Sequence, residues 1–167
     1  GAGASGLTCG YYLARIGYDV DVFESHDMAG GVLAYGIPEY RLPKKVLARE
    51  IGFIRKFGVD FLLKHKVDAD HMRKIAQDFD AVFVASGAYR NMPLGIPGEN
   101  LEGVMAGISF LETVLTKHKP AIGKDILIIG AGNVAVDAAR TALRFGANVT
   151  IVYRRDKDDM PANKDEL

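Results

Sequence analysis

The sequence predicts an α/β protein with two Rossmann-like dinucleotide-binding units, each built on parallel strands. A glycine-rich run opens the chain as Gly1-Ala2-Gly3-Ala4-Ser5-Gly6 and recurs as Gly130-Ala131-Gly132-Asn133-Val134-Ala135. The offset is 129 residues throughout (130 − 1, 135 − 6), and Arg15-Ile16-Gly17 aligns with Arg144-Phe145-Gly146 in the same register. One such turn is weak evidence. Two in register, each followed by a helical and a strand-like stretch, predict two βαβ units.

Composition narrows the possible classes of protein. The 167 residues are 49% hydrophobic and 25% charged, which is typical of a globular chain of one or two domains. Lys and Arg number 21 and so do Asp and Glu, so the zero net charge argues against nucleic acid or an anionic membrane as partner. No apolar run is long enough to span a bilayer. The one cysteine, Cys9, leaves no disulfide framework, CxxC pair or iron–sulfur site within these residues, and we expect a cytoplasmic protein.

The two ends of the sequence carry one signal each. Lys164-Asp165-Glu166-Leu167 matches an endoplasmic-reticulum retrieval signal, which we interpret as coincidence because no secretory leader precedes Gly1. The β-branched run Ile126–Ile129 leads into the second glycine turn, whereas no such strand precedes the first. We therefore expect this sequence to be a fragment of a longer protein.

The first unit begins with a predicted helix from Leu7 to about Ile16, which Gly17 ends in the C′ position. A strand over residues 18–23 then leads to Glu24, 18 residues after Gly6 (24 − 6). About 20 residues is the usual spacing for an acidic residue that binds the ribose hydroxyls of a dinucleotide. The spacing predicts that role for Glu24; the alternative is a solvated carboxylate at the end of a strand.

Residues 30–43 are too rich in glycine and proline for a regular element, and too apolar for an idle surface loop. Gly30-Gly31 would let the backbone approach a bulky ligand, and Arg41 could meet a phosphate. The alternative is a long connection whose apolar side chains only fill the core.

Further elements follow from periodicity and turn residues. Residues 44–57 predict a helix after Pro43 that Gly58 ends, residues 60–67 a strand, and Asp70 the cap of a short helix. Ala81–Ala85 predicts a strand buried in a parallel sheet, and the small residues Ser86-Gly87-Ala88 would leave room for a ligand at its carboxyl end. The second half predicts a helix over residues 108–115, a turn at Lys119-Pro120, and strands over residues 126–129 and 149–153.

The Pro- and Gly-containing stretch 91–103 predicts the crossing between domains. We expect an FAD-binding domain over residues 1–95 and an NAD(P)H-binding domain over residues 96–167, both incomplete. Each glycine turn would direct backbone amides and the positive end of a helix at a pyrophosphate.

The two predicted sites differ at the residue that follows the second strand. Glu24 in the first suits a free adenosine ribose, as in FAD or NAD. The matching position in the second is Tyr153, followed by Arg154 and Arg155, a guanidinium pair that would hold a 2′-phosphate. The sequence therefore predicts FAD in the first site and NADPH in the second. The alternative is that both arginines only solvate the end of a strand.

Two adjacent dinucleotide sites imply hydride transfer from nicotinamide to flavin, with the protein supplying orientation. We find no catalytic triad and no metal cluster, and we name no catalytic residue. Cys9 is expected to pack between helix and sheet. The four histidines are scattered along the sequence and expected to be exposed: His26, His65, His71 and His118.

The chain also resembles the small (β) subunit of NADPH-dependent glutamate synthase and its relatives. These relatives include the flavoprotein subunits of sulfide dehydrogenase and ferredoxin:NADP transhydrogenase, and the flavin portion of dihydropyrimidine dehydrogenase. The resemblance covers essentially the whole chain and is carried by residues 30–44, Gly130–Asp137, Val152-Tyr153-Arg154-Arg155 and Met160-Pro161-Ala162.

The resemblance implies that NADPH reduces FAD and that electrons pass through iron–sulfur clusters, outside this segment, to a catalytic partner such as the glutamate synthase large subunit. The predicted FAD site comprises Gly1, Gly3, Ala4, Ser5, Gly6, Glu24, Gly30, Gly31, Val32, Arg41, Val67, Ser86 and Gly87. The predicted NADPH site comprises Gly130, Ala131, Gly132, Asn133, Val134, Ala135, Arg154 and Arg155.

Three other functions remain open at this point. The chain could belong to a sulfide dehydrogenase or ferredoxin:NADP transhydrogenase, since the partner decides the acceptor. It could be a non-catalytic dinucleotide-binding fragment. A disulfide reductase would need a cysteine pair, and Cys9 stands alone.

Overall fold

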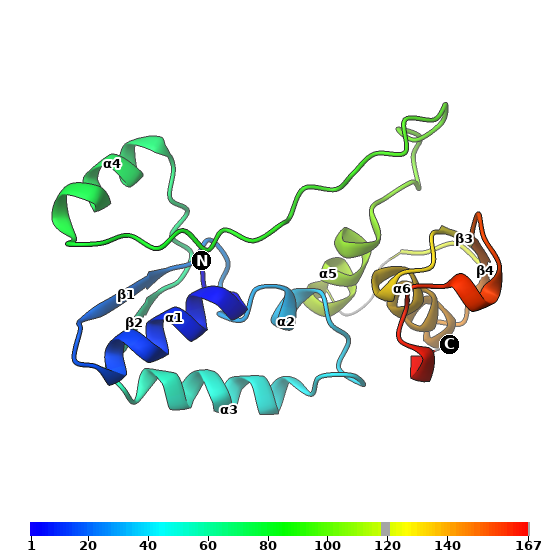
Figure 1. The fold of residues 1–167 in the computed structure, drawn as a ribbon. Coiled ribbons are helices and arrows are strands. Elements are labelled where there is room, and N and C mark those ends of the chain that lie inside the picture. The colour runs from blue at the N-terminus through cyan, green and yellow to red at the C-terminus, as the bar shows by residue number, and fades with distance from the viewer. Residues whose placement is uncertain (118–120, 167) are drawn as a thin grey trace. The chain divides into compact units, whose positions relative to one another are not determined.

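The computed structural model of this chain describes residues 1–117 and 121–166, and it shows an α/β protein (Figure 1). The chain divides into two compact units, Gly1–Ala34 with Glu39–Tyr89 and Tyr35–Pro38 with Arg90–Leu167. The predicted boundary after residue 95, with a dinucleotide-binding domain on either side, stays a prediction. The predicted turn at Lys119-Pro120, like His118 and the final residue of the terminal signal, lies outside the described residues.

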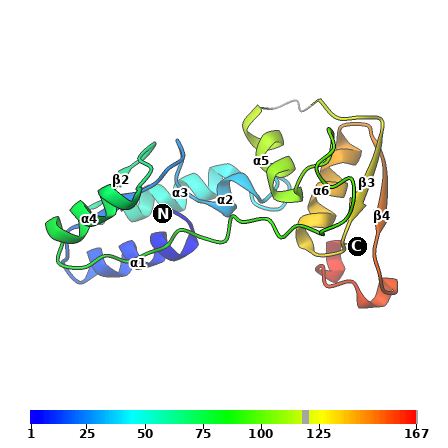
Figure 2. The same ribbon diagram turned by 90° about the horizontal axis from the view of Figure 1, so that it is seen from above.

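The first unit places two helices on one face of a parallel strand pair. β1 (Val20–Phe23) and β2 (Val59–Leu62) pair from Val20↔Val59 to Phe23↔Leu62. α1 (Ala4–Arg15) contacts both strands and α3 (Lys44–Arg55), and the two helices lie side by side (Figures 1 and 2). The close approach of α1 depends on Gly10, where an added Cβ would lie 3.5 Å from both Val22 Cγ2 and Val59 Cγ1.

Gly17 ends α1 as predicted. Its φ is +95° and its amide donates to Ala14 O at 3.1 Å, the geometry that favours glycine after a helix. The helix itself begins three residues earlier than expected, at Ala4, because the glycine turn runs directly into it. β1 is two residues shorter than the predicted strand, since its ladder with β2 begins only at Val20↔Val59.

Three local predictions for the first unit are wrong in detail. The strand predicted over residues 60–67 ends at Leu62, because Lys64 has a φ of +55° and turns the chain out of the sheet. Asp68, and not Asp70, caps α4 (Ala69–Asp78), since its carboxylate accepts from Asp70 N and His71 N. The stretch 30–43, expected to hold no regular element, contains the one-turn helix α2 (Val32–Tyr35).

The predicted strand Ala81–Ala85 is also wrong: no ladder hydrogen bonds form there, and residues 81–84 are exposed, with Val84 at 66%. A strand needs a hydrogen-bonded neighbour about 4.7–4.9 Å away. β1 and β2 pair with each other, and a hollow separates β1 from residues 81–85. The apolar sequence alone therefore does not make this segment a strand among the described residues.

The second unit repeats the βαβ arrangement. β3 (Asp125–Ile129) and β4 (Asn148–Val152) pair in parallel from Asp125↔Asn148 to Ile129↔Val152. α6 (Asn133–Arg144) connects them and packs on both strands, and α5 (Gly107–Lys117) packs on α6. Two short 3-10 turns follow, η1 (Lys157–Asp159) and η2 (Lys164–Glu166).

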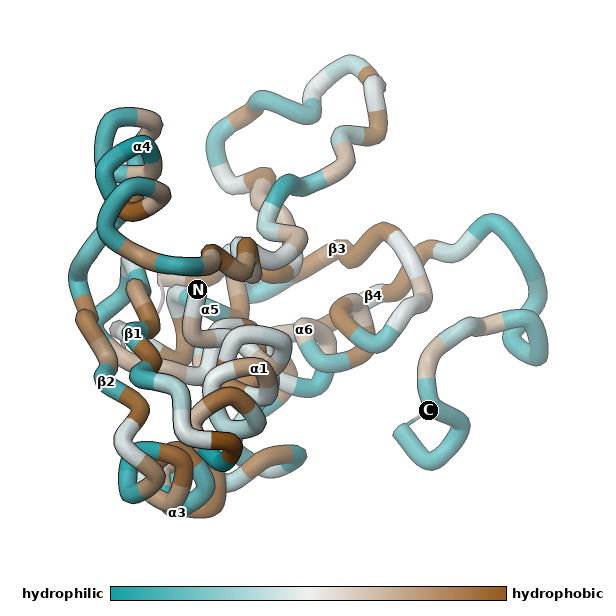
Figure 3. The backbone as a smooth tube through the Cα atoms, turned by 60° about the vertical axis from the view of Figure 1, so that its left-hand side comes forward, coloured by the Kyte–Doolittle hydropathy of each residue, from teal (hydrophilic) through white to brown (hydrophobic). Residues whose placement is uncertain are grey.

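One face of this second strand pair carries the core. Ile126, Ile128 and Val149 face Leu111 of α5 and Ala142 of α6. β3 is apolar from residue 126 to its end (Figure 3), yet Leu127 on the opposite face is 62% exposed. Burial of both faces, which the continuous apolar run favours, is therefore not observed among the described residues.

Nothing in the described residues forms a helix both long and apolar enough to cross a bilayer.

Candidate functional site

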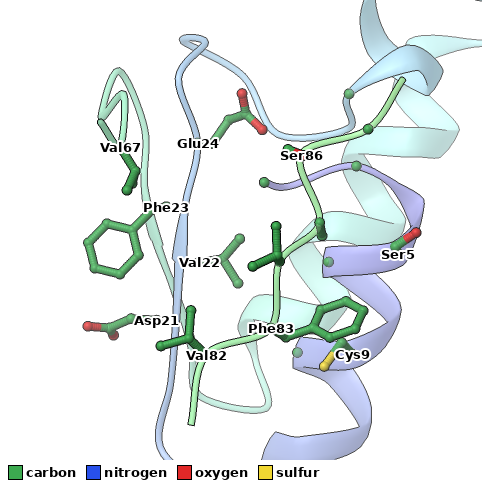
Figure 4. A pocket seen from close by; sticks show the side chains of 18 of the residues that line it. Ser5, Cys9, Asp21, Val22, Phe23, Glu24, Val67, Val82, Phe83 and Ser86 are labelled. Atoms are coloured by element: carbon green, nitrogen blue, oxygen red, sulfur yellow. The ribbon is translucent and has the colours of Figure 1, made fainter. Parts of the chain in front are cut away.

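A hollow of about 650 Å³ lies in the first unit between α1, β1 and residues 81–87 (Figure 4). It brings together most of the predicted first-site residues, from five separate parts of the chain. Gly30 and Arg41 are not in its lining, so the predicted phosphate contact of Arg41 stays a prediction. The members in the lining are Gly1, Gly3, Ala4, Ser5, Gly6, Glu24, Gly31, Val32, Val67, Ser86 and Gly87.

Glu24 stands at one end of this hollow, close to Ser86 in Figure 4. Its side chain is buried, with only 6% of the residue exposed, and protein donors hold both oxygens. Oε2 accepts from Ala2 N at 2.7 Å, while Oε1 accepts from His26 N and His26 Nδ1, each at 2.9 Å. Ser25 Oγ also donates to Oε1, at 3.2 Å. A carboxylate oxygen has two lone pairs, so Oε2 keeps acceptor capacity for a further hydroxyl.

These hydrogen bonds determine the charge of Glu24. Burial by itself raises the pKa of the carboxyl, because the charged form loses hydration. The backbone amides of His26 and Ala2, followed by the side chains of His26 and Ser25, outweigh burial and bring the pKa below its ordinary value. Glu24 is thus an ionised acceptor with a fixed orientation.

Bare backbone forms the neighbouring part of the hollow. Gly31 has a φ of +54°, and an added Cβ would lie 2.8 Å from Gly3 Cα. Gly6 packs equally closely, because its added Cβ would lie 1.9 Å from Gly1 O. Only glycine therefore allows these backbone segments to meet, and the surface they form carries no side chain that would keep a phosphate away from the amides at the start of α1.

The opposite end of the hollow is apolar and borders the free edge of β1. Cys9 of α1, with Val82 and Phe83 across from β1, lies at this end (Figure 4). By the 129-residue repeat β1 corresponds to β4, which pairs through one edge with β3, the strand that leads into Gly130. The corresponding edge of β1 faces the hollow. Among the described residues, this end thus has a strand edge without a partner strand. The groups that could bind a polar ligand, the Glu24 carboxylate and the glycine backbone, lie at the other end.

The histidines are less scattered than the sequence suggests. His26 is half-buried against Glu24 and its ring stacks on Tyr89, with centroids 5.8 Å apart. His65 and His71 bring their rings within 5.6 Å of each other. His26 lines the site and sequence reasoning missed it; its place two residues after the acidic residue was the available signal. No group of His, Cys, Asp and Glu among the described residues could hold a metal ion.

The second glycine turn also leads directly into a helix, but it has different hydrogen-bond partners. Gly130 has a φ of +118°, and its amide donates to Val152 O at 2.9 Å, which joins the turn to the end of β4. Gly132 precedes α6 in extended conformation, with open space where a Cβ would be. Asn133 and Val134 are exposed at the helix start, Ala135 is half-buried and Ala131 is buried. Arg154 and Arg155 are exposed in the bend after β4.

Each unit thus presents the first-turn amides of a helix, which have no acceptor within the helix, beside a turn free of bulky side chains. In the first unit a fixed carboxylate follows β1, and in the second unit two guanidinium groups follow β4. These residues fit a dinucleotide: amides for a pyrophosphate, a carboxylate for a hydroxyl pair, and guanidinium groups for a further phosphate.

Comparison with known proteins identifies relatives along the whole chain. Residues 1–163 match the family model described as pyridine nucleotide-disulphide oxidoreductase. The NADP(+)-dependent formate dehydrogenase subunit beta of Moorella thermoacetica is 43% identical over 172 residues, covering 100% of this chain and 24% of that protein. The glutamate synthase [NADPH] small chain of Halomonas elongata is 36% identical over 179 residues, covering 100% and 38%. The similarity to glutamate synthase small chains is therefore confirmed, and this chain spans only about a quarter to two fifths of these relatives.

A solved structure supports the fold. Mycobacterium tuberculosis FprA in complex with NADPH matches with a TM-score of 0.80 and 22% identity, over 99% of this chain and 44% of that one. At this identity the match shows a shared fold alone.

The bare backbone contact predicts a strong effect of one methyl group. Gly31→Ala should lower the free energy of unfolding by at least about 1–2 kcal/mol, because alanine disfavours positive φ and its Cβ would press on Gly3. Urea unfolding measures this loss. Gly52→Ala is the matched control: it lies in α3 with nothing within 4 Å, and it should raise stability by about 0.5–1 kcal/mol. Equal effects at both positions would contradict the close contact.

The lowered pKa of Glu24 predicts a pH-dependent contribution to stability. That contribution is fully present above the ordinary carboxyl pKa of 4.5, and it is lost as the pH falls through the lower pKa of the folded state. The stability difference between the native protein and Glu24→Gln, from urea unfolding at several pH values, should shrink below pH 4.5. Glu102→Gln, which removes an exposed carboxylate, is the control for the substitution itself. A Glu24→Gln difference that is constant with pH would refute the assignment.

Proposed function

Because the chain belongs to the pyridine nucleotide-disulphide oxidoreductase family, we propose that it is the nucleotide-binding part of an NADPH-dependent flavoprotein oxidoreductase similar to the glutamate synthase small chain. The observation that carries this proposal is the pairing, in one hollow, of a side-chain-free backbone surface with a fixed carboxylate. Gly3 and Gly31 supply the first and Glu24 the second.

The first unit is proposed to bind FAD. The amides at the start of α1 would hold the pyrophosphate, Glu24 would accept from the ribose hydroxyls, and Ser86-Gly87 would border the ligand. The remaining residues of this proposed site are Gly1, Ala4, Ser5, Gly6, Gly30, Val32, Val67 and, by the sequence prediction, Arg41.

The second unit is proposed to bind NADPH. The amides of Asn133, Val134 and Ala135 at the start of α6 would hold its pyrophosphate, beside Gly130, Ala131 and Gly132. Arg154 and Arg155, exposed after β4, would bind the 2′-phosphate that distinguishes NADPH from NADH. A carboxylate at the equivalent place in the first unit would repel that phosphate, so the two units would select different nucleotides.

In this proposal the chain supplies binding and orientation, not acid–base groups. When bound, FAD supplies the redox chemistry: it accepts two electrons as hydride from NADPH and releases them singly. The electrons would pass to iron–sulfur clusters of a partner domain or subunit in the cytoplasm. Two relatives are both named for NADP(H) but for different reactions: one is an NADP(+)-dependent formate dehydrogenase subunit and the other a glutamate synthase [NADPH] small chain. We therefore assign the choice of acceptor to the partner.

Flavin uptake and reduction test the proposal directly. The purified protein, incubated with FAD and freed of excess, should keep a visible flavin absorption band, which anaerobic NADPH should bleach. Stopped-flow absorbance measures the bleaching rate. A colourless protein that takes up no flavin would rule the function out. Nucleotide binding without bleaching would favour a non-catalytic binding fragment.

The proposed 2′-phosphate contact predicts a selective loss. Arg154→Glu with Arg155→Glu should weaken NADPH binding about 10- to 100-fold, because hydrogen bonds to charged groups contribute about 1.5–3 kcal/mol. NADH binding should change less than about threefold. Isothermal titration calorimetry measures both affinities. Lys124→Glu, before the amino end of β3, controls for a charge reversal elsewhere in the unit. Equal losses for the two nucleotides would show that the arginines do not bind the 2′-phosphate.

A further inference from the structure

After β4 the chain folds back across the glycine-rich turn of the second unit. Ala162 N donates to Ala131 O at 3.2 Å, and Asn163 N donates to Asn133 Oδ1 at 2.9 Å. Ala131 and Ala162 are 2% and 5% exposed, so this contact is closed to water. We call residues 153–166 the return loop. It attaches to the turn through two hydrogen bonds and a buried pair of small side chains.

The far end of the return loop is anchored on α6. The Glu166 carboxylate forms an ion pair with the Arg140 guanidinium, and both side chains are partly buried. Glu166 N also donates to Asn163 O at 2.9 Å. The 3-10 turn η2 therefore joins Glu166, which pairs with Arg140, to Asn163, which contacts the glycine turn. A partly buried ion pair is screened less by salt than an exposed one.

The beginning of the return loop is attached to the same turn. Val152 O accepts from Gly130 N at 2.9 Å, immediately before the loop starts. Inside the loop, Tyr153 Oη donates to Asp159 O at 3.1 Å across η1. Arg154 and Arg155 therefore lie in a segment closed at both ends on the glycine turn, by Gly130 on one side and by Ala131 and Asn133 on the other.

We propose that the return loop is a specificity device: Asn133, Asn163 and the Arg140–Glu166 pair hold Arg154 and Arg155 at a fixed place relative to the glycine turn. This inference rests on the proposed function of the second unit. Two arginines on a free tail would lose conformational freedom on binding a phosphate, whereas arginines on a closed loop lose less. The loop would thus contribute to affinity for the 2′-phosphate and not to affinity for the rest of the nucleotide.

The side chain of Asn133 has a different role from the one that the sequence predicts. The sequence predicts it as a cofactor contact, but its side-chain oxygen already accepts from Asn163 N. Asn133 is therefore a positioning residue through its side chain, and its backbone amide at the start of α6 is what it offers a pyrophosphate.

The test uses two variants that open the loop at different points. Glu166→Gln removes the charge that pairs with Arg140, and Asn163→Pro removes the amide that donates to Asn133 Oδ1. Asp165→Asn removes a charge from the neighbouring, exposed side chain and is the matched control. Arg140→Glu combined with Glu166→Arg reverses the pair and should restore it. Isothermal titration calorimetry with NADPH and NADH measures affinity, and amide hydrogen exchange at Ala162 and Asn163 measures loop closure in the 167-residue chain.

Glu166→Gln and Asn163→Pro should each weaken NADPH binding by about tenfold and leave NADH binding within about twofold. Both should lose exchange protection at Ala162, while Asp165→Asn should behave as the native protein and the reversed pair should recover. Lost protection with an unchanged preference for NADPH would overturn the inference, because the loop would then be only structural. Equal weakening of both nucleotides would overturn it too.

The nucleotide preference of the native protein distinguishes failure of the specificity role from failure of the proposed function. No preference for NADPH in the native protein, with Ala162 and Asn163 still protected, would refute the proposed function of an intact second unit and the specificity role with it. A native preference for NADPH that survives loop opening would refute the specificity role alone.

Discussion

The backbone of Ala2 makes the two hydrogen bonds on which the first unit depends. Its amide donates to Glu24 Oε2 at 2.7 Å and its carbonyl accepts from Gly30 N at 2.7 Å. The first bond ties the glycine turn to the end of β1, and the second brings Gly31 against Gly3. Ala2 itself is fully buried, so neither bond competes with water. One residue thus aligns the carboxylate and the bare backbone surface of the hollow.

This arrangement explains why Glu24 is buried and ionised at once. An isolated carboxylate in this position would be protonated or expelled, because burial disfavours its charge. Two backbone amides and two neighbouring side chains compensate for the lost hydration and also fix the carboxylate direction. The residue expected to bind a ribose is therefore part of the framework that shapes its own site. A substitution there would change stability and ligand binding together.

The second unit achieves the same closure with later parts of the chain. Its turn is tied to β4 through Gly130 N and Val152 O, and Tyr153 stands after the strand where the first unit has Glu24. The return loop comes back instead, and its contacts with Ala131 and Asn133 cover one side of the turn. The two units of the 129-residue repeat thus share the turn, the helix and the strand that follows it. The residues directly after that strand, β1 in the first unit and β4 in the second, differ in charge. That divergence is where we propose that nucleotide selectivity lies.

Although α3 ends at Arg55 and not at the expected residue 57, the sequence alone determined the α/β class, the two glycine turns, the end of α1 at Gly17, and the contrast between Glu24 and Arg154-Arg155. These features depend on local geometry and on spacing along the chain, which a sequence states directly. Tertiary structure decided what depends on neighbours. Ala81–Ala85 is apolar yet forms no ladder, because strand formation needs a partner strand. Asn133 accepts from Asn163 N, a contact between residues far apart in the chain that no spacing rule contains. Only folding brings those atoms within hydrogen-bonding distance.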